Sequence, residues 1–121
     1  MKKVKRADAE QSEYAATSTV LDYSNILNTQ NIDFCINKIS GRYPTEGYCS
    51  NLGVDELCYV LEGSGTIFKT NDKPINFEKG DVIFINKGDI YYWLGNFEVA
   101  LICTPAWSKK QCNLYSEASL K

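Results

Sequence analysis

Glu56 and Tyr91 are the residues best suited to chemistry in a sequence that lacks imidazole. None of the 121 residues is histidine, which excludes serine–histidine and cysteine–histidine catalysis. Alternation predicts that Glu56, Cys58 and Val60 share one face of a strand, and a buried carboxylate is costly unless its pKa rises or a donor meets it. Tyr91 could be that donor if it faces Glu56. The pair would then either lock the fold or transfer protons to a bound ligand, whereas an outward Glu56 would simply be solvated.

The elements that must position these residues are predicted to be strands. From about Ser18, short runs rich in Val, Ile, Phe and Tyr recur between Gly, Asn, Asp and Pro, which is typical of a sandwich or barrel. The predicted strands are residues 19–23, 32–39, 42–48, 56–62, 65–70, 74–77, 81–85, 91–93 and 97–103. Turns are predicted over 62–65, 70–74, 78–81 and 86–89. We expect one all-β domain over 18–121, with a loose, flexible N-terminal arm over 1–17 and a short C-terminal helical turn within 108–116.

The charge balance and the cysteines limit the classes of partner and the cell compartment that we expect for this protein. Thirteen basic and fifteen acidic residues give a net charge of −2, so no nucleic-acid footprint is present. No stretch reaches the ~20 apolar residues needed to cross a bilayer, so no membrane partner is expected. The five cysteines show no CxxC spacing, and three lie in apolar runs, which favours buried thiols in a reducing compartment. Residues 7–11 lack the apolar core of a secretory signal, so we expect a cytoplasmic protein.

Glutamate, glycine and tyrosine residues between positions 56 and 91 have a spacing that resembles that of one family. Gly80 and Gly88 stand eight apart with Tyr91 three residues further, and Glu56 is followed by six residues and Gly63. These spacings resemble the two sequence motifs of the cupins, with Tyr91 in place of a histidine. The resemblance covers roughly residues 33–105, and the stretches 41–44 and 104–107 are similar to those of small stand-alone bacterial cupins. It implies a double-stranded β-helix, or jelly-roll, barrel.

The positions that hold a metal ion in many cupins carry other residues in this sequence. The resemblance maps a three-histidine, one-glutamate set onto Cys49, Asn51, Glu56 and Tyr91. A thiol, an amide, one carboxylate and a phenol make a poor, mixed ligand set for a divalent ion. The resemblance therefore implies a cupin pocket without a metal or other cofactor. Weak metal binding by Asn51, Glu56 and Tyr91 is the alternative.

Aromatic and polar side chains are expected to line the pocket of such a barrel. The predicted ligand-binding residues are Tyr43, Tyr48, Asn51, Glu56, Tyr91 and Trp93. The rings could stack on a sugar or another planar ligand, although core packing explains Trp93 equally well. We expect a metal-free protein that binds a small polar molecule, either a carbohydrate or a metabolite acid. The alternatives are an isomerase, epimerase or lyase that moves protons with Glu56 and Tyr91, and an enzyme with a weakly bound metal.

An apolar surface on the opposite side of the strands predicts a homodimer. The residues expected to form it are Leu57, Tyr59, Leu61, Ile83 and Ile85. A monomer would have to cover such a surface, and sheet-to-sheet dimerisation is common among cupins.

Overall fold

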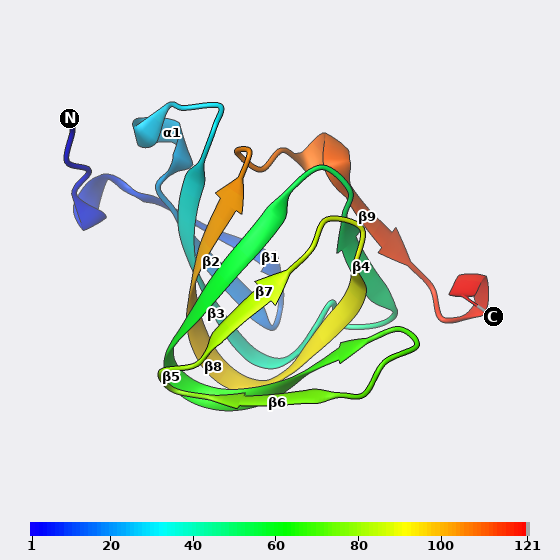
Figure 1. The fold of residues 1–121 in the computed structure, drawn as a ribbon. Coiled ribbons are helices and arrows are strands. Elements are labelled where there is room, and N and C mark those ends of the chain that lie inside the picture. The colour runs from blue at the N-terminus through cyan, green and yellow to red at the C-terminus, as the bar shows by residue number, and fades with distance from the viewer. Residues whose placement is uncertain (121) are drawn as a thin grey trace.

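One curled sheet of nine strands dominates the computed structural model, which describes residues 1–120 (Figure 1). The strands are β1 (Glu10–Ala15), β2 (Ser18–Asp22), β3 (Asp33–Tyr43), β4 (Tyr48–Asn51), β5 (Asp55–Lys69), β6 (Ile75–Glu78), β7 (Val82–Ile85), β8 (Ile90–Thr104) and β9 (Cys112–Tyr115). One short helix, α1 (Ser24–Leu27), and three 3₁₀ turns (Arg6–Asp8, Lys109–Gln111 and Ala118–Leu120) complete the described chain. The all-β barrel predicted from the sequence is confirmed.

Strands β5 and β8 are long and bend, so that each contributes to both sides of the barrel (Figure 1). They pair antiparallel along nearly their whole length, with a bulge in β5 between Val60 and Glu62. Gly65 lies opposite Gly95, and a Cβ atom built on Gly95 would lie 2.6 Å from the Gly65 Cα atom. Only glycine lets the two backbones approach this closely at the bend. The reversing turn predicted over 62–65 is therefore wrong, because these glycines bend one strand.

Both ends of the chain add strands that the sequence did not predict. β1 pairs antiparallel with β2, within the stretch 1–17 where the sequence predicts a loose arm. Most residues of β1 are exposed, so it lacks the apolar alternation that marks a strand in a sequence. Near the C-terminus, the helical turn predicted within 108–116 is limited to Lys109–Gln111, and β9 follows it and pairs with β4.

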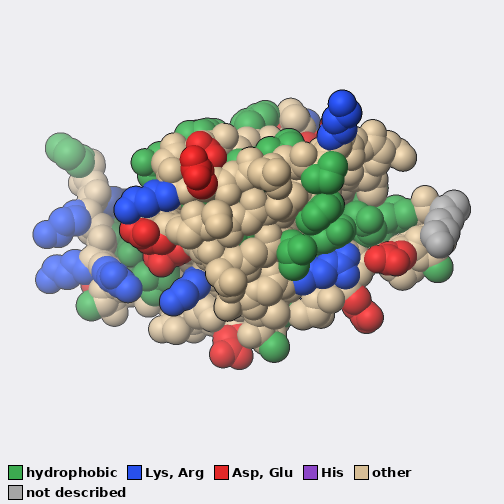
Figure 2. Space-filling model, turned by 90° about the horizontal axis from the view of Figure 1, so that it is seen from below, with side chains coloured by type: hydrophobic (Ala, Val, Ile, Leu, Met, Phe, Trp, Pro, Cys, Tyr) green, Lys and Arg blue, Asp and Glu red, His purple; other side chains and the backbone are tan. Residues whose placement is uncertain are grey.

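Aromatic rings fill the part of the barrel that lies between the long strands and β6. Phe77 and Phe97 pack edge to face with centroids 4.8 Å apart, and Trp93 lies 5.3 Å from Phe97. Each such ring contributes roughly 1.5–3 kcal/mol through burial. Figure 2, which views the barrel from the β6 end, shows mostly backbone and polar side chains over the middle, with apolar side chains toward its edges. The pocket inside the barrel lies beyond this cluster and is lined by neither Phe77 nor Phe97.

The apolar outer face of the sheet differs from the predicted one on β7. Ile83 and Ile85 are buried inside the barrel, opposite Cys58 and Glu56 of β5. Alternation therefore turns the other two residues of β7 outward. The exposed apolar side chains of β5 and β7 are Leu57, Tyr59, Val82 and Phe84. No helix within residues 1–120 is long and apolar enough to cross a membrane.

Candidate functional site

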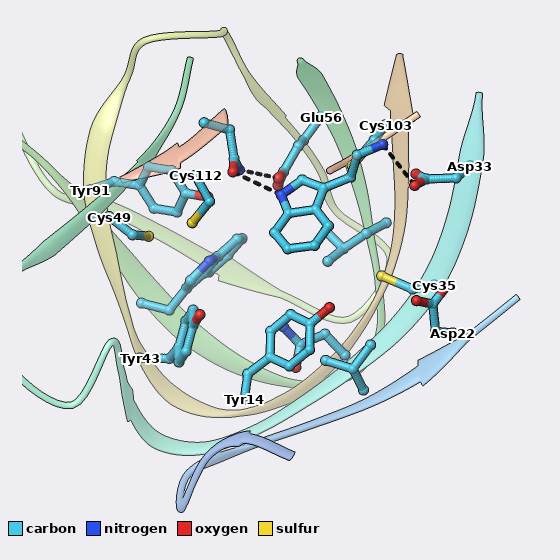
Figure 3. A pocket seen from close by; sticks show the side chains of 16 residues that line it. Tyr14, Asp22, Asp33, Cys35, Tyr43, Cys49, Glu56, Tyr91, Cys103 and Cys112 are labelled. Atoms are coloured by element: carbon cyan, nitrogen blue, oxygen red, sulfur yellow. Dashed lines mark hydrogen bonds between the residues drawn. The ribbon is translucent and has the colours of Figure 1, made fainter. Parts of the chain in front are cut away.

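A pocket inside the barrel is surrounded by side chains from β1, β2, β3, β4, β5, β8 and β9 (Figure 3). The space open to water-sized molecules is about 80 Å³. One water molecule needs roughly 10–15 Å³ of such space, so the pocket has room for several waters or for part of a small ligand.

Most of the residues that the sequence predicted for the site come together in this pocket. Those that line it are Tyr43, Cys49, Asn51, Glu56, Tyr91 and Trp93. Tyr48 does not line it, because its ring packs edge-on against Tyr92 with centroids 5.2 Å apart. Side chains alternate along β4, so Cys49 and Asn51 point into the pocket while Tyr48 points to the other face. The assignment of Tyr48 to this pocket is corrected accordingly.

The pocket also contains residues that the sequence analysis did not assign to a site. They are Tyr14, Val20, Asp22, Asp33, Cys35, Asn37, Leu101, Cys103, Trp107 and Cys112. In the run 32–37, Asp33, Cys35 and Asn37 alternate with Ile32, Phe34 and Ile36. By itself this pattern predicts that the apolar residues point inward, so the sequence carries no local signal that Asp33 lies in the pocket.

Glu56 is held at the wall of the pocket by an amide and not by the phenol predicted for this role. Its side chain is only 6% exposed, and Asn51 Nδ2 donates a hydrogen bond to Glu56 Oε1. Tyr91 instead lies opposite Cys49 across β4 and β8. The condition for the expected Glu56–Tyr91 pair, that the two residues face one another, is not met, and Asn51 takes the place of the donor.

Two side chains from the C-terminal segment fix the orientation of the Asn51 amide. Trp107 Nε1 donates to Asn51 Oδ1 at 3.0 Å, and Gln111 Nε2 donates to the same oxygen at 3.1 Å. The indole N–H is a donor only, so it can face the amide oxygen but not the amide nitrogen. The NH₂ group of Asn51 consequently faces Glu56.

The carboxyl groups of Asp33 and Glu56 lie on either side of Cys103. Asp33 of β3 and Glu56 of β5 are both register partners of Cys103 on β8, and all three side chains point inward. Burial raises the pKa of Glu56 from 4.5 to about 7; the charge of Asp33 adds to this and the Cys103 thiol opposes it. Burial also raises the pKa of Asp33, although the main-chain N–H of Trp107, which donates to Asp33 Oδ2 at 2.8 Å, opposes that rise.

Comparison with known families identifies the fold. A family model described as the EutQ-like cupin domain matches residues 47–112, more than half of the chain. The chain is a cupin. No curated protein matches this cupin.

Solved structures similar to this cupin include proteins with different chemistries. Pac13, described as a nucleoside dehydratase, aligns with a TM-score of 0.83 at 14% identity, covering 96% of this chain and 92% of its own. The polyketide cyclase RemF from Streptomyces resistomycificus aligns with a TM-score of 0.65 at 15% identity, covering 92% of this chain and 89% of its own. A predicted oxalate decarboxylase from Thermotoga maritima aligns with a TM-score of 0.67 at 18% identity, covering 87% of this chain and 100% of its own. These likenesses support the jelly-roll barrel and, at such identities, no particular activity.

The residues of this cupin at the positions that hold a metal ion in many cupins do not fit a divalent metal ion. Asn51 Oδ1, the only ligand atom that its amide could offer, already accepts hydrogen bonds from Trp107 and Gln111. Burial raises the pKa of Cys49 to about 12 and that of Tyr91 well above 10, which opposes the ionisation that a metal ligand needs. Among the described residues, no group of three or more His, Cys, Asp or Glu side chains is arranged to hold a metal ion. Glu56 alone could offer an anionic ligand, and one carboxylate does not make a metal centre.

Proposed function

We propose that this cupin binds a small, uncharged, hydroxylated molecule in its barrel pocket without a metal ion. The observation that carries this proposal is a pocket wall with acidic hydrogen-bond acceptors on one side and aromatic rings on the other (Figure 3). Asp33 and Glu56 each have carboxyl oxygens that could accept hydrogen bonds from ligand hydroxyl groups. Such bonds would fix the orientation of a ligand within a concave, largely pre-formed site.

Aromatic rings support a ligand with a flat or ring-shaped part. Tyr14 and Trp107 are stacked with centroids 6.0 Å apart, and Tyr14 and Tyr43 lie across the pocket from Glu56 (Figure 3). Ring faces of this kind stack on sugar rings and on planar bases. The structurally similar Streptomyces PAC13 has been described with uridine, a nucleoside that combines both features.

The charge of the pocket favours a neutral ligand over the metabolite acid that the sequence left open. Among the described residues, no Lys or Arg lines the pocket, whereas Asp22, Asp33 and Glu56 do. A ligand carboxylate would meet like charges in a partly desolvated space, which costs free energy. We therefore retain the hydroxylated class and drop the acid.

A second candidate function is proton transfer to the bound molecule, as in a lyase or an isomerase. It is favoured by Glu56, whose carboxyl faces the pocket with a pKa of about 7, and by the second carboxyl of Asp33 beside Cys103. A group with a near-neutral pKa can both take and give a proton. Tyr91 keeps its proton and could donate a hydrogen bond to the ligand, but it would not act as the base.

A thermal-shift screen tests the binding proposal. We expect uridine or glucose to raise the melting temperature of the wild type, since a ligand that binds only the native state stabilises it by mass action. Succinate, Mn²⁺ and Ni²⁺ should have no such effect. Stabilisation by succinate or by a metal ion alone would overturn the proposal.

Two glutamine variants separate binding from catalysis. Glu56→Gln should weaken or abolish the ligand-induced shift, whereas Glu78→Gln, at an exposed glutamate of β6, should leave it unchanged. If Glu56→Gln keeps the shift but abolishes turnover of the stabilising ligand, as followed by NMR, the catalytic function is supported. An unchanged shift together with unchanged turnover would contradict both roles of Glu56.

A further inference from the structure

Trp107 is connected to both carboxyl groups of the pocket through two different N–H donors. Its main-chain N–H donates to Asp33, and its indole N–H donates to Asn51, which in turn donates to Glu56. The dashed lines in Figure 3 mark these three hydrogen bonds. Trp107 precedes the 3₁₀ turn Lys109–Gln111, so one short segment after β8 reaches both sides of the acidic wall.

The orientation of the Asn51 amide decides what Glu56 meets. With Oδ1 bound by Trp107 and Gln111, the amide presents its NH₂ group to Glu56, and an N–H donor favours an ionised carboxylate. A flipped amide would present its oxygen, which favours a protonated carboxyl because only the neutral acid can donate to it. The two orientations are nearly equal in shape, so hydrogen-bond partners select between them.

We propose that Trp107 is a positioning residue that acts through the Asn51 amide to present a hydrogen-bond donor to Glu56. This inference rests on the proposed function, since it identifies what prepares the Glu56 carboxyl for a ligand. Trp107 thus sets how readily Glu56 gives up its proton, in addition to covering the pocket together with Tyr14.

Few other groups around Glu56 could do the same. The titratable groups that affect Glu56 or are affected by it, on the strands packed around it, are Asp33, Cys35, Tyr43, Cys49, Cys58, Tyr91, Cys103 and Cys112. None of them is cationic, and Asp33 raises the pKa of Glu56. The Cys103 thiol lowers this pKa, but thiols are weak donors. The Asn51 amide is a stronger donor and forms a hydrogen bond with the Glu56 carboxyl. Asn51 is therefore the principal donor to Glu56, and its orientation matters most.

NMR titration of the ligand-free protein tests the inference. In protein with ¹³C-labelled glutamate, the Glu56 carboxyl is assigned by its loss in Glu56→Gln. Trp107→Phe keeps a ring against Tyr14 and the main-chain donor to Asp33 but removes the indole N–H. We expect the Glu56 titration midpoint to rise by roughly half to one pH unit, and to rise further in Trp107→Phe/Gln111→Leu, which removes both donors to Asn51.

The direction in which the Glu56 titration midpoint moves distinguishes a positioning role of Trp107 from a role as a cover over the pocket. A smaller ring that only uncovers the pocket would hydrate Glu56 and lower its midpoint. Tyr14→Leu, which removes cover but no donor to Asn51, serves as the matched control and should lower the midpoint or leave it unchanged. A lowered or unchanged midpoint in Trp107→Phe and in the double variant would overturn the inference.

Two further measures keep the test decisive. If Trp107→Phe fails to fold, Asn51→Leu must still raise the midpoint, because it removes the amide donor through which Trp107 is proposed to act on Glu56. An unchanged midpoint in that variant would then count against the inference. Because the titration needs no ligand, a failed ligand screen would contradict the proposed function without affecting this result.

Discussion

Replacing Glu56 by glutamine should remove a pH-dependent loss of stability from this protein. Burial raises the pKa of Glu56 from 4.5 to about 7 in the native state, and the unfolded chain should return it to near 4.5. Below the unfolded pKa the carboxyl is protonated in both states, so it destabilises neither. As the pH rises from about 4.5 to about 7, the unfolded chain releases this proton while the native state keeps it, so the free energy of unfolding falls over that range and levels off once Glu56 is ionised in both states.

The size of the effect follows from the shift and from the burial of the group. Each pKa unit corresponds to about 1.4 kcal/mol, so Glu56 should cost the native state about 3 kcal/mol once it is fully ionised. Since the side chain is 6% exposed, solvent screens this cost little. Urea unfolding at about pH 4 and about pH 8 gives the free energy of unfolding of Glu56→Gln and of the wild type. The difference between the two proteins should be about 3 kcal/mol more in favour of Glu56→Gln at the higher pH.

Glu78→Gln provides the control, because Glu78 is exposed. The difference in unfolding free energy between this variant and the wild type should stay nearly the same at both pH values. If the unfolding free energy of Glu56→Gln differs from that of the wild type by the same amount at both pH values, the reasoning is refuted. That result would mean that Glu56 is as well solvated in the native state as in the unfolded chain.

Two other predictions concern the fold and its outer face. The homodimer stays a prediction, and sedimentation velocity should show dissociation in Phe84→Glu on the β7 face but not in Leu114→Glu, at an exposed residue of β9. In denaturant unfolding, Gly63→Ala should lose about 3 kcal/mol or more, because its φ is +81° and a Cβ would lie 2.1 Å from the Asn96 carbonyl oxygen. Gly80→Ala should lose only about 1–2 kcal/mol, since φ is +92° but nothing lies within 4 Å; equal losses in the two glycine variants would contradict this account.

Alternation and turn spacing in the sequence predict much of the barrel, because both are local properties. Alternation puts Tyr91 and Trp93 on one face of a strand and Glu56 on one face with Cys58 and Val60, and the resemblance to cupins implies that the Glu56 face points inward. In the structure, Glu56, Tyr91 and Trp93 all line the pocket. Alternation and turn spacing fail where geometry depends on a partner strand. The strands predicted over 91–93 and 97–103 are one strand, since Gly95 bends β8 against β5 without ending it.

The candidate site could be predicted only in part, because its hydrogen bonds join residues far apart in the chain. Trp107 meets Asp33 and Asn51 across 74 and 56 residues, and no local pattern encodes these distances. The donor to Glu56 was misassigned for the same reason. The motif spacing placed Tyr91 near Glu56, but cross-strand register gives Tyr91 to Cys49.

Raised carboxyl pKa values limit the negative charge of this pocket. Asp33 and Glu56 lie on either side of Cys103, and no basic side chain lines the pocket in the described part of the chain. Two buried carboxylates near one another are costly unless a proton or a cation compensates one of them. Burial raises the pKa of both groups, so protonation of one of them is the compensation that the described residues offer. A proton on Glu56 would exchange near neutral pH, and for this reason we propose that a bound molecule is recognised or changed through the carboxyl pair.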